Sequence, residues 1–362
     1  MSSKFFIDPD IKKAETLPAD FYRDEAIFDK VKEAVFLKAW QFVGDDSLLP
    51  FEKYAHPFSY LEHFINEPLA LVKQADGEIK CMSNVCTHRG NIVVQQSGKQ
   101  RGLSCMYHGR KFSLSGDFEH MPEFKEAEDF PRPCEGLQNF PLEKWGKFIF
   151  TALDPAFEFS DVISKMEERI GFLPLEHFKL DSSLSRDYLV NANWALYCDN
   201  YLEGFHIPFV HPDLNATLDY GEYKTELYDH MSLQIGYADD GVDCFDLPSG
   251  HPDEGRKVAA YYYWVYPNMM FNFYPWGLSI NLVQPITINK TKVKFISYVY
   301  DHEKLEVGAG ALLDKVERED EFVVEGVQKG ISSRYYQRGR FSPTREQGVH
   351  HFQRMLSEAI NS

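Results

Sequence analysis

The chain lacks the features of several protein classes. No apolar run reaches the roughly 20 residues of a membrane helix, and the N-terminal MSSKFFIDPD lacks the apolar stretch of a secretory signal. Six cysteines in 362 residues are too few for a disulfide scaffold and indicate a reducing compartment. A formal net charge of −17 disfavours binding to nucleic acid or to an anionic membrane. We therefore expect a cytoplasmic protein without a membrane or nucleic-acid partner.

The length of the chain predicts two domains, and its apolar pattern predicts their type. Apolar residues at helical spacing predict a helix over 24–40, and short strands follow from residue 41 to a closing strand at 145–151. The pattern after Pro155 is mixed. It predicts helices over 162–172, 195–209, 312–332 and 342–360, and strands over 180–190, 224–236, 258–266, 268–274, 278–288 and 292–300. The fold class is therefore α+β. We expect a helical segment (1–40) packed on the second domain, an all-β domain (41–155), and helices laid on an antiparallel sheet (156–362).

Two short motifs within residues 81–116 each pair a cysteine with a histidine. Cys86-Thr87-His88 and Cys105-Met106-Tyr107-His108 are separated by sixteen residues. Two cysteines on one iron and two histidines on the other form a Rieske [2Fe–2S] centre. A structural zinc also accepts two cysteines and two histidines, but zinc fingers usually keep the cysteines together and the histidines together. The mixed pairs favour Cys86, His88, Cys105 and His108 as ligands of an iron–sulfur cluster, with zinc as the alternative.

A second set of candidate metal ligands begins at Asp199. On a continuous helix Asp199, Glu203 and His206 would share one face, and a helix break at Pro208 would allow His211 to converge with His206. Two histidines and one carboxylate with open positions suit non-haem Fe(II).

We select Asp320 as the third ligand because it is the only charged member of an otherwise apolar helical stripe. The stripe consists of Leu312, Val316, Asp320, Val323 and Val327. A carboxylate that faces a core needs a partner, which is either a metal or an arginine. The neighbouring Glu319 and Glu321 fall outside this stripe.

These motifs resemble the alpha subunits of the Rieske non-haem iron oxygenases over nearly the whole chain. The resemblance rests on Cys86 to Gly90, on Tyr107-His108-Gly109, on the histidines 206 and 211, and on the dipeptide Glu319-Asp320. It implies a helix-grip domain that holds mononuclear Fe(II) through His206, His211 and Asp320, with O2 as cosubstrate. Arg110 stands where these oxygenases more often have tryptophan, which we interpret as a packing variant.

The resemblance also implies roles for two further acids and for partners. In that family, the acid three residues before the first iron-ligating histidine, here Glu203, links the cluster of one subunit to the iron of the next, which requires a ring, commonly a trimer. The plain alternative for Glu203 is a solvated helix charge. Asp199 is a candidate to orient a ligand histidine. Because the chain has no convincing dinucleotide loop, a separate flavin or ferredoxin-type reductase must supply electrons.

The substrate is the least determined property. Residues 261–276, YYYWVYPNMMFNFYPW, are rich in aromatic rings that attract quaternary ammonium groups but also fill sheet cores. We select Tyr263, Phe271 and Trp276 as pocket residues. With Glu203, and with a likeness to choline-, betaine- and carnitine-type enzymes, they favour N-demethylation or C–N oxidation of a quaternary ammonium compound. Ring hydroxylation of an aromatic compound and a zinc-stapled, non-catalytic binding protein are the alternatives.

Overall fold

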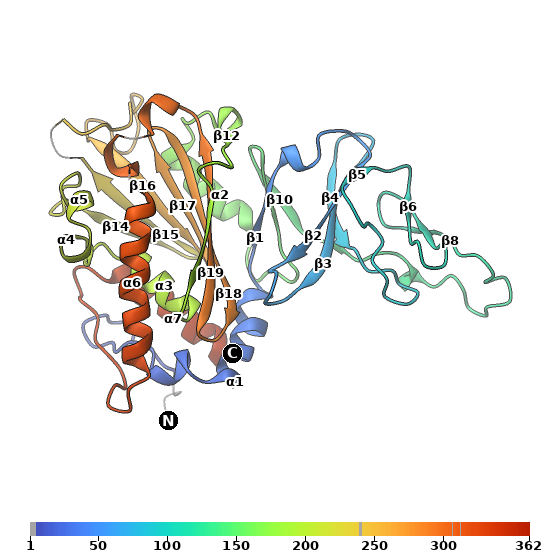
Figure 1. The fold of residues 1–362 in the computed structure, drawn as a ribbon, viewed down its shortest axis with the longest axis horizontal. Coiled ribbons are helices and arrows are strands. Elements are labelled where there is room, and N and C mark those ends of the chain that lie inside the picture. The colour runs from blue at the N-terminus through green and yellow to red at the C-terminus, as the bar shows by residue number, and fades with distance from the viewer. Residues whose placement is uncertain (1–4, 239–240, 306, 312) are drawn as a thin grey trace. The chain divides into compact units, whose positions relative to one another are not determined.

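The chain forms two compact units, and one of them is built from two segments that are separated in the sequence. The computed structural model describes residues 5–238, 241–305, 307–311 and 313–362 (Figure 1). Residues Lys38–Phe157 form one compact unit, and Glu158–Ser362 form the other together with the N-terminal segment up to Leu37. The fold class is the predicted α+β, with an all-β unit and a unit of helices on an antiparallel sheet.

The unit of residues 38–157 consists of three small antiparallel sheets, in the strand orders β1-β11-β10, β5-β2-β3-β4-β9 and β6-β7-β8. The strand predicted over 145–151 is confirmed as β11 from Phe148 to Thr151, but its start is wrong, because Gly146 takes a positive φ of 53° and turns the chain into the hairpin β10–β11. The strands are β1 Gln41–Asp45, β2 Tyr54–Tyr60, β3 Glu67–Lys73, β4 Ile79–Ser83, β5 Gly98–Lys99, β6 Leu103–Ser104, β7 Lys111–Phe112, β8 Phe118–His120, β9 Asn139–Phe140, β10 Leu142–Trp145 and β11 Phe148–Thr151.

The other unit is built on one antiparallel sheet with the order β12-β19-β18-β17-β16-β15-β14, and β13 also pairs with β19. Two predicted strands are split by turns: 180–190 becomes β12 and β13, and 224–236 becomes the hairpin β14–β15. The strands are β12 Lys179–Leu180, β13 Arg186–Val190, β14 Lys224–Tyr228, β15 Met231–Tyr237, β16 Val258–Val265, β17 Met269–Tyr274, β18 Gly277–Thr287 and β19 Lys290–Val299.

Helices cover both faces of this sheet (Figure 1). They are α1 Glu25–Val31, α2 Phe159–Ile170, α3 Trp194–Tyr201, α4 Ile207–Val210, α5 Pro212–Asn215, α6 Leu313–Ile331 and α7 Gln347–Asn361. The ring of Trp264 in β16 packs edge-on against Phe352 of α7, with ring centroids 5.2 Å apart. On the other face, Arg169 of α2 forms an ion pair with Asp253 at 2.7 Å. The N-terminal segment joins this unit, since Phe36 packs on Trp194 of α3.

The predicted apolar stripe of α6 is out of phase with the observed one. The buried residues of α6 are Glu317, Val324 and Ile331, whereas Val327 is 43% exposed. Leu312, the first member of the predicted stripe, lies outside the described residues. Glu317 is buried, and Asp320 lies half-buried at the border of this face, so Asp320 is not the only acid of α6 that faces the interior.

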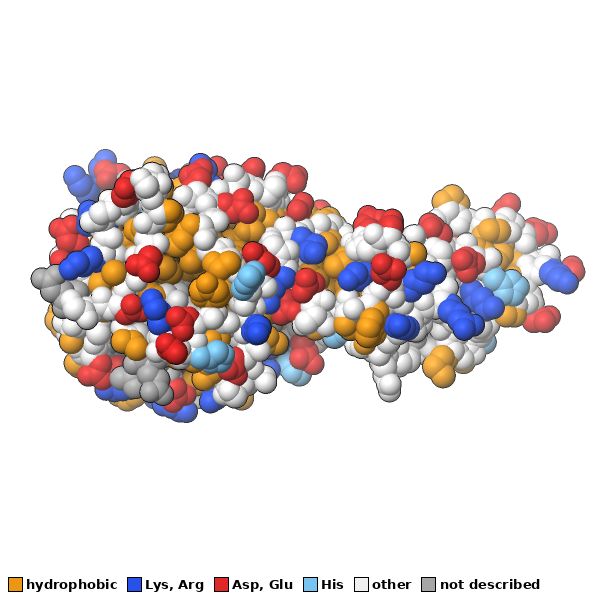
Figure 2. Space-filling model, turned by 90° about the horizontal axis from the view of Figure 1, so that it is seen from above, with side chains coloured by type: hydrophobic (Ala, Val, Ile, Leu, Met, Phe, Trp, Pro, Cys, Tyr) orange, Lys and Arg blue, Asp and Glu red, His pale blue; other side chains and the backbone are white. Residues whose placement is uncertain are grey.

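Charged side chains of both signs are spread over the face of each unit that Figure 2 shows. Among the described residues, no helix combines the length and the apolar character that crossing a bilayer requires.

Candidate metal centres and catalytic cavity

Two loops of the 38–157 unit present the predicted cluster ligands in the same local conformation. In the first loop the backbone N–H of Gly90 donates to the carbonyl of Cys86 at 2.9 Å, and in the second Gly109 donates to Cys105 at 3.0 Å. Both glycines have a φ of 71°, a left-handed conformation that only glycine adopts at little cost. Each tight turn brings a cysteine and the histidine two or three residues later to the same side.

The four side chains suit a two-iron cluster in chemistry and placement. Cys86 and Cys105 are buried, and the rings of His88 and His108 lie 4.8 Å apart between centroids. The Nδ1 atom of His108 is buried and has no hydrogen-bond partner among the described residues, as a ligating nitrogen would. Burial and the neighbouring His108 and Arg89 lower the pKa of His88, which favours the neutral imidazole that binds metal. The donor set therefore fits a Rieske cluster.

The structure argues against the alternative of a single zinc ion at this place. In the described part of the chain, the group of donor atoms that all lie within 4.8 Å of one another is His206, His211 and Asp320, and it does not include the two cysteines. Four ligands of one tetrahedral zinc would converge on a single point. Donors that span two iron atoms do not.

Arg110 is buried beside these loops and does more than fill space. It is 1% exposed, and its guanidinium lies 2.5 Å from the carboxylate of Glu135. The guanidinium is also 4.8 Å from the ring centre of Phe118. Arg110 is buried, as a packing residue would be, but it also brings a buried ion pair close to Cys86 and His88.

The mononuclear site begins where helix α3 ends. This helix ends earlier than predicted. The helix stops at Tyr201, so Asp199, Glu203 and His206 do not share the face of one continuous helix. The carboxylate of Glu203 instead accepts hydrogen bonds from the backbone N–H groups of Phe205 and of His206, the latter at 3.1 Å. Pro208 does not cause the break, because it occupies the first turn of α4, where a missing N–H costs nothing.

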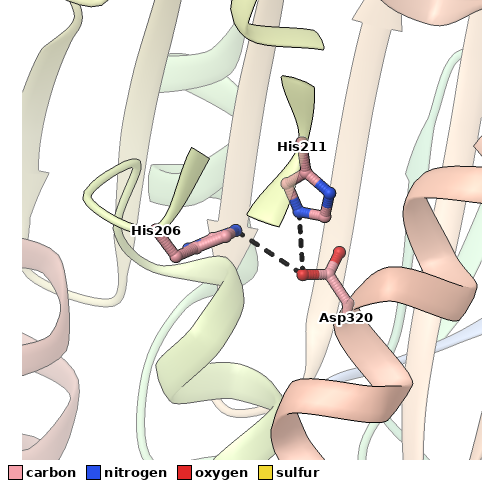
Figure 3. A group of neighbouring side chains, drawn as sticks. All are labelled: His206, His211 and Asp320. Carbon is pink, nitrogen blue, oxygen red and sulfur yellow. Dashed lines mark hydrogen bonds and ion pairs between the residues drawn. The ribbon is translucent and has the colours of Figure 1, made fainter. Parts of the chain in front are cut away.

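The structure brings the three predicted iron ligands together from two separate segments (Figure 3). One carboxylate oxygen of Asp320 lies 3.0 Å from Nε2 of His211 and 3.5 Å from Nε2 of His206. His206 and His211 flank the short helix α4, whereas Asp320 projects from α6 (Figure 3). No arginine among the described residues pairs with Asp320, so the alternative of an arginine-held acid is not what the structure shows.

Three further side chains orient these candidate ligands through hydrogen bonds. Glu203 accepts from Nδ1 of His206 at 2.7 Å. Glu319 accepts from Nδ1 of His211, also at 2.7 Å. The amide of Asn200 donates to Asp320 at 2.6 Å. The two carboxylates direct the Nε2 atoms of both histidines toward Asp320, the arrangement by which proteins orient metal-ligating imidazoles.

The electrostatics of this group attract a cation. Burial by itself lowers the pKa of His211, but hydrogen bonds to Asp320 and Glu319 outweigh it and raise the pKa above its ordinary value. The same negative field stabilises a divalent metal ion. Two imidazole nitrogens and one carboxylate are the donors expected for a non-haem ferrous site. Sequence reasoning missed Glu319 because it placed this residue off the helical stripe, and it missed Asn200 entirely.

Asp199 does not take the predicted role of orienting a histidine. Its carboxylate accepts hydrogen bonds from Tyr22 at 3.0 Å and from Gln353 of α7 at 3.0 Å. Helix α3 turns this side chain away from the metal site, and its neighbour Asn200 faces the site instead. Asp199 therefore ties the N-terminal segment and α7 to α3.

A cavity of about 110 Å³ adjoins the three candidate ligands. This volume is several times the roughly 10–15 Å³ that a cavity needs to hold one water, so a small organic molecule can enter it. Five tyrosines line the cavity, and the polar residues Gln234, Asn272, Ser279 and Asn281 line its sheet side. The tyrosines are Tyr197, Tyr201, Tyr223, Tyr262 and Tyr274.

The predicted pocket residues Tyr263, Phe271 and Trp276 are wrong, because none of them lines this cavity. Tyr263 and Phe271 are cross-strand partners on β16 and β17, and both are fully buried on the opposite face of the sheet. Trp276 stacks on Tyr274 in an apolar cluster. Side chains alternate between the two faces of a strand, so an assignment that is wrong by one residue changes the face.

Comparison with known protein families assigns each of the two sites to a known domain. Residues 39–141 match the Rieske [2Fe-2S] domain, and residues 175–362 match the catalytic domain of the ring hydroxylating alpha subunits. The second match covers half of the chain. The protein belongs to the Rieske non-haem iron oxygenases. It is thus an oxidoreductase whose cofactors are a [2Fe–2S] cluster and a mononuclear iron, with O2 as cosubstrate.

The chain is similar in sequence to choline monooxygenases and to carnitine monooxygenase oxygenase subunits. It is 29% identical over 369 residues to the chloroplastic choline monooxygenase of Arabidopsis thaliana, covering 96% of this chain and 84% of the relative. It is 28% identical over 364 residues to the carnitine monooxygenase oxygenase subunit of Escherichia coli K12, covering 96% and 95% of the two chains.

Solved structures share the fold of this Rieske oxygenase. A quaternary ammonium Rieske monooxygenase in complex with L-carnitine superposes with a TM-score of 0.76 at 22% identity over 99% of both chains. A naphthalene 1,2-dioxygenase variant bound to phenanthrene superposes with a TM-score of 0.72 at 18% identity over 96% of this chain and 93% of that one.

Proposed function

We propose that this oxygenase oxidises a small quaternary ammonium compound by N-demethylation or C–N oxidation. The observation that carries the proposal is the cavity beside His206, His211 and Asp320, which combines tyrosine rings with carboxylates. Among the described residues that line it there is no lysine or arginine. Tyrosine faces and carboxylates attract ammonium cations, and the absence of fixed positive charge leaves that attraction unopposed. The choline and carnitine monooxygenases among its relatives act on compounds of this class.

Within this proposal, His206, His211 and Asp320 hold the mononuclear iron, and Cys86, His88, Cys105 and His108 hold the cluster. The bound iron supplies O2 activation with electrons from the cluster. The chain itself orients the two imidazoles through Glu203 and Glu319 and encloses the substrate beside them. Hydroxylation of an N-methyl group consumes O2, two electrons and two protons and releases one water. In the resulting N-hydroxymethyl ammonium ion the C–N bond breaks, and formaldehyde and a proton are released, which leaves the demethylated tertiary amine.

The path of the electrons forms a second part of the proposal. Glu203 is bound to His206, and the neighbouring Phe205 and Phe209 are 42% and 79% exposed. In the cluster loops Met106 and Tyr107 are 81% and 58% exposed. Such exposed apolar side chains suit contact between copies of the chain. We propose a homotrimer in the cytoplasm, in which Glu203 links the mononuclear site to the cluster of a neighbouring subunit. A separate NAD(P)H-dependent reductase of the flavin or ferredoxin type supplies the electrons.

This assignment gives each part of the chain a role. Residues 41–155 would carry the cluster and 156–362 the substrate and the mononuclear iron, while residues 1–40 would support the second part.

Substrate turnover with a supplied reductase, NADH and O2 tests the proposal. Choline, glycine betaine, carnitine and stachydrine are compared with benzoate and naphthalene, and the products are formaldehyde, the demethylated amine and ring diols. We expect coupled loss of NADH and substrate with at least one ammonium compound. Ring hydroxylation without turnover of any amine would favour the alternative of an aromatic-ring hydroxylase, for which the fold shared with naphthalene dioxygenase is the supporting observation.

A further inference from the structure

Glu317 is a buried carboxylate in the wall of the cavity. It lies on α6 one turn before Asp320, and its side chain is 2% exposed. Residues three apart on a helix lie on the same side, so Glu317 and Asp320 both face the cavity that they line. The hydroxyl of Tyr197 donates to Oε2 of Glu317 at 2.5 Å. The other oxygen, Oε1, is buried and has no hydrogen-bond partner among the described residues.

The described surroundings of Glu317 provide no basic side chain that pairs with it. None of the described lysine, arginine or histidine side chains forms an ion pair with it, and the hydroxyl that donates to it belongs to a neutral tyrosine. Burial raises the pKa of Glu317 well above its ordinary value, with the nearby Asp320 adding to the effect, and a cation bound in the cavity would oppose this shift and favour the charged carboxylate. A buried carboxylate oxygen without a protein partner is usually completed by water, by a cation or by a hydrogen-bond donor. Because Glu317 lines the cavity, a ligand that enters the cavity can supply that partner.

The sheet side of the same cavity holds a second unsatisfied acceptor. Gln234 is 1% exposed, and its amide nitrogen donates to the carbonyl of Tyr201 at 2.7 Å. That bond fixes the orientation of the amide and leaves Oε1 buried without a partner among the described residues. A free carbonyl oxygen accepts a hydroxyl proton, whereas it repels a carboxylate. The described lining contains no lysine or arginine that would pair with a carboxylate.

We propose that Glu317 is the counter-ion for the quaternary ammonium group of the substrate, and that the cavity favours ammonium alcohols over ammonium carboxylates. The tyrosine rings that line the cavity receive the methyl groups of the cation, and Gln234 accepts the hydrogen bond of the hydroxyl. The inference rests on the proposed function and deepens it. Glu317 selects the positive charge of the substrate, and Gln234 selects a hydroxyl over a carboxylate at its other end.

The test compares a cation with its uncharged isostere on the iron-loaded enzyme. Choline and 3,3-dimethylbutan-1-ol differ in one atom, since carbon replaces the quaternary nitrogen. Their dissociation constants are measured by calorimetry for the wild type, for Glu317→Gln and for Glu321→Gln. The last variant removes a carboxylate from the same helix outside the cavity. Glutamine retains the size of Glu317 and an oxygen that accepts from Tyr197.

We expect Glu317→Gln to weaken choline binding by about 30-fold or more, because it removes one partner of a buried charge pair. Binding of 3,3-dimethylbutan-1-ol should change less than about twofold by comparison. A parallel loss for both ligands, or no loss for choline, would overturn the role of Glu317. If the variant does not fold, the wild type still decides, because equal affinity for choline and its isostere excludes a counter-ion.

The preference for a hydroxyl over a carboxylate is tested by comparing the binding of choline and glycine betaine to the wild type. We expect choline to bind about tenfold more tightly or better, and tighter binding of betaine would refute this part of the proposal. Failure of the proposed function gives a different result. In that case the wild type neither binds nor oxidises any ammonium compound. A failed inference alone leaves ammonium turnover intact in Glu317→Gln with an unchanged preference for the cation.

Discussion

Glu319 provides the sharpest test of how the mononuclear site is built. Its carboxylate accepts a hydrogen bond from Nδ1 of His211 at 2.7 Å, while Nε2 of that ring points to Asp320. Replacing Glu319 with glutamine leaves an oxygen that can still accept from Nδ1 but removes the negative charge. The tautomer of His211 is then preserved, and what is lost is the charge that raises the basicity of the imidazole.

The structure sets the expected size of the effect. A hydrogen bond to a charged acceptor is about twice as strong as one to a neutral acceptor, which places the loss at about 1–2 kcal/mol. This corresponds to about 5- to 30-fold weaker binding of ferrous ion. The Glu319 side chain is 27% exposed, and this exposure favours the lower part of the 10- to 100-fold range that such outer-shell changes usually cause.

Competition with a chelator under anaerobic conditions measures this difference. The mononuclear iron is removed, and ferrous ion is titrated back in the presence of graded chelator. The visible spectrum of the Rieske cluster reports that the rest of the protein is intact. Glu321→Gln serves as the control, because it removes a carboxylate two residues away that is not bonded to either histidine. If Glu319→Gln and Glu321→Gln retain the same affinity as the wild type, the orienting role of Glu319 is refuted.

Three further predictions address neighbouring residues. Asp320→Ala should lose the mononuclear iron but keep the cluster, so that iron falls from about three to about two per chain by elemental analysis; full iron would move the ligand to Glu319. Glu203→Gln should keep both metals and the cluster spectrum but lose most steady-state turnover, and normal turnover would contradict the bridging role. Burial raises the pKa of Asp199 from 3.8 to about 7, so folding favours its protonated form, and this stabilisation is lost as the pH rises through about 7. Asp199→Asn should therefore flatten the fall in thermal stability between about pH 4 and pH 7, each unit of pKa shift corresponding to about 1.4 kcal/mol, and an unchanged slope would refute the assignment.

The sequence predicted the chemistry of the sites because that chemistry depends on residue types and local spacing. A cysteine and a histidine within one tight turn point to the same side whatever surrounds them, and the turn needs only the glycine that follows. The α+β class also followed from the sequence, since apolar periodicity distinguishes strands from helices. The convergence of His206 and His211 was expected for the wrong reason, because the helix ends at Tyr201 rather than at Pro208.

Only the tertiary structure decided which of several similar residues face the same space. Among the acids of α6, the phase of the helix against the sheet places Glu317 in the cavity and Glu319 on His211, a choice that sequence periodicity assigned incorrectly. Among the aromatic residues of β16 and β17, strand parity places Tyr262 and Tyr274 in the cavity and Tyr263 and Phe271 on the other face. The physical reason is the same in both cases. A rotation of about 100° per residue in a helix, or about 180° in a strand, changes the environment completely, and the phase is set by packing between segments distant in sequence.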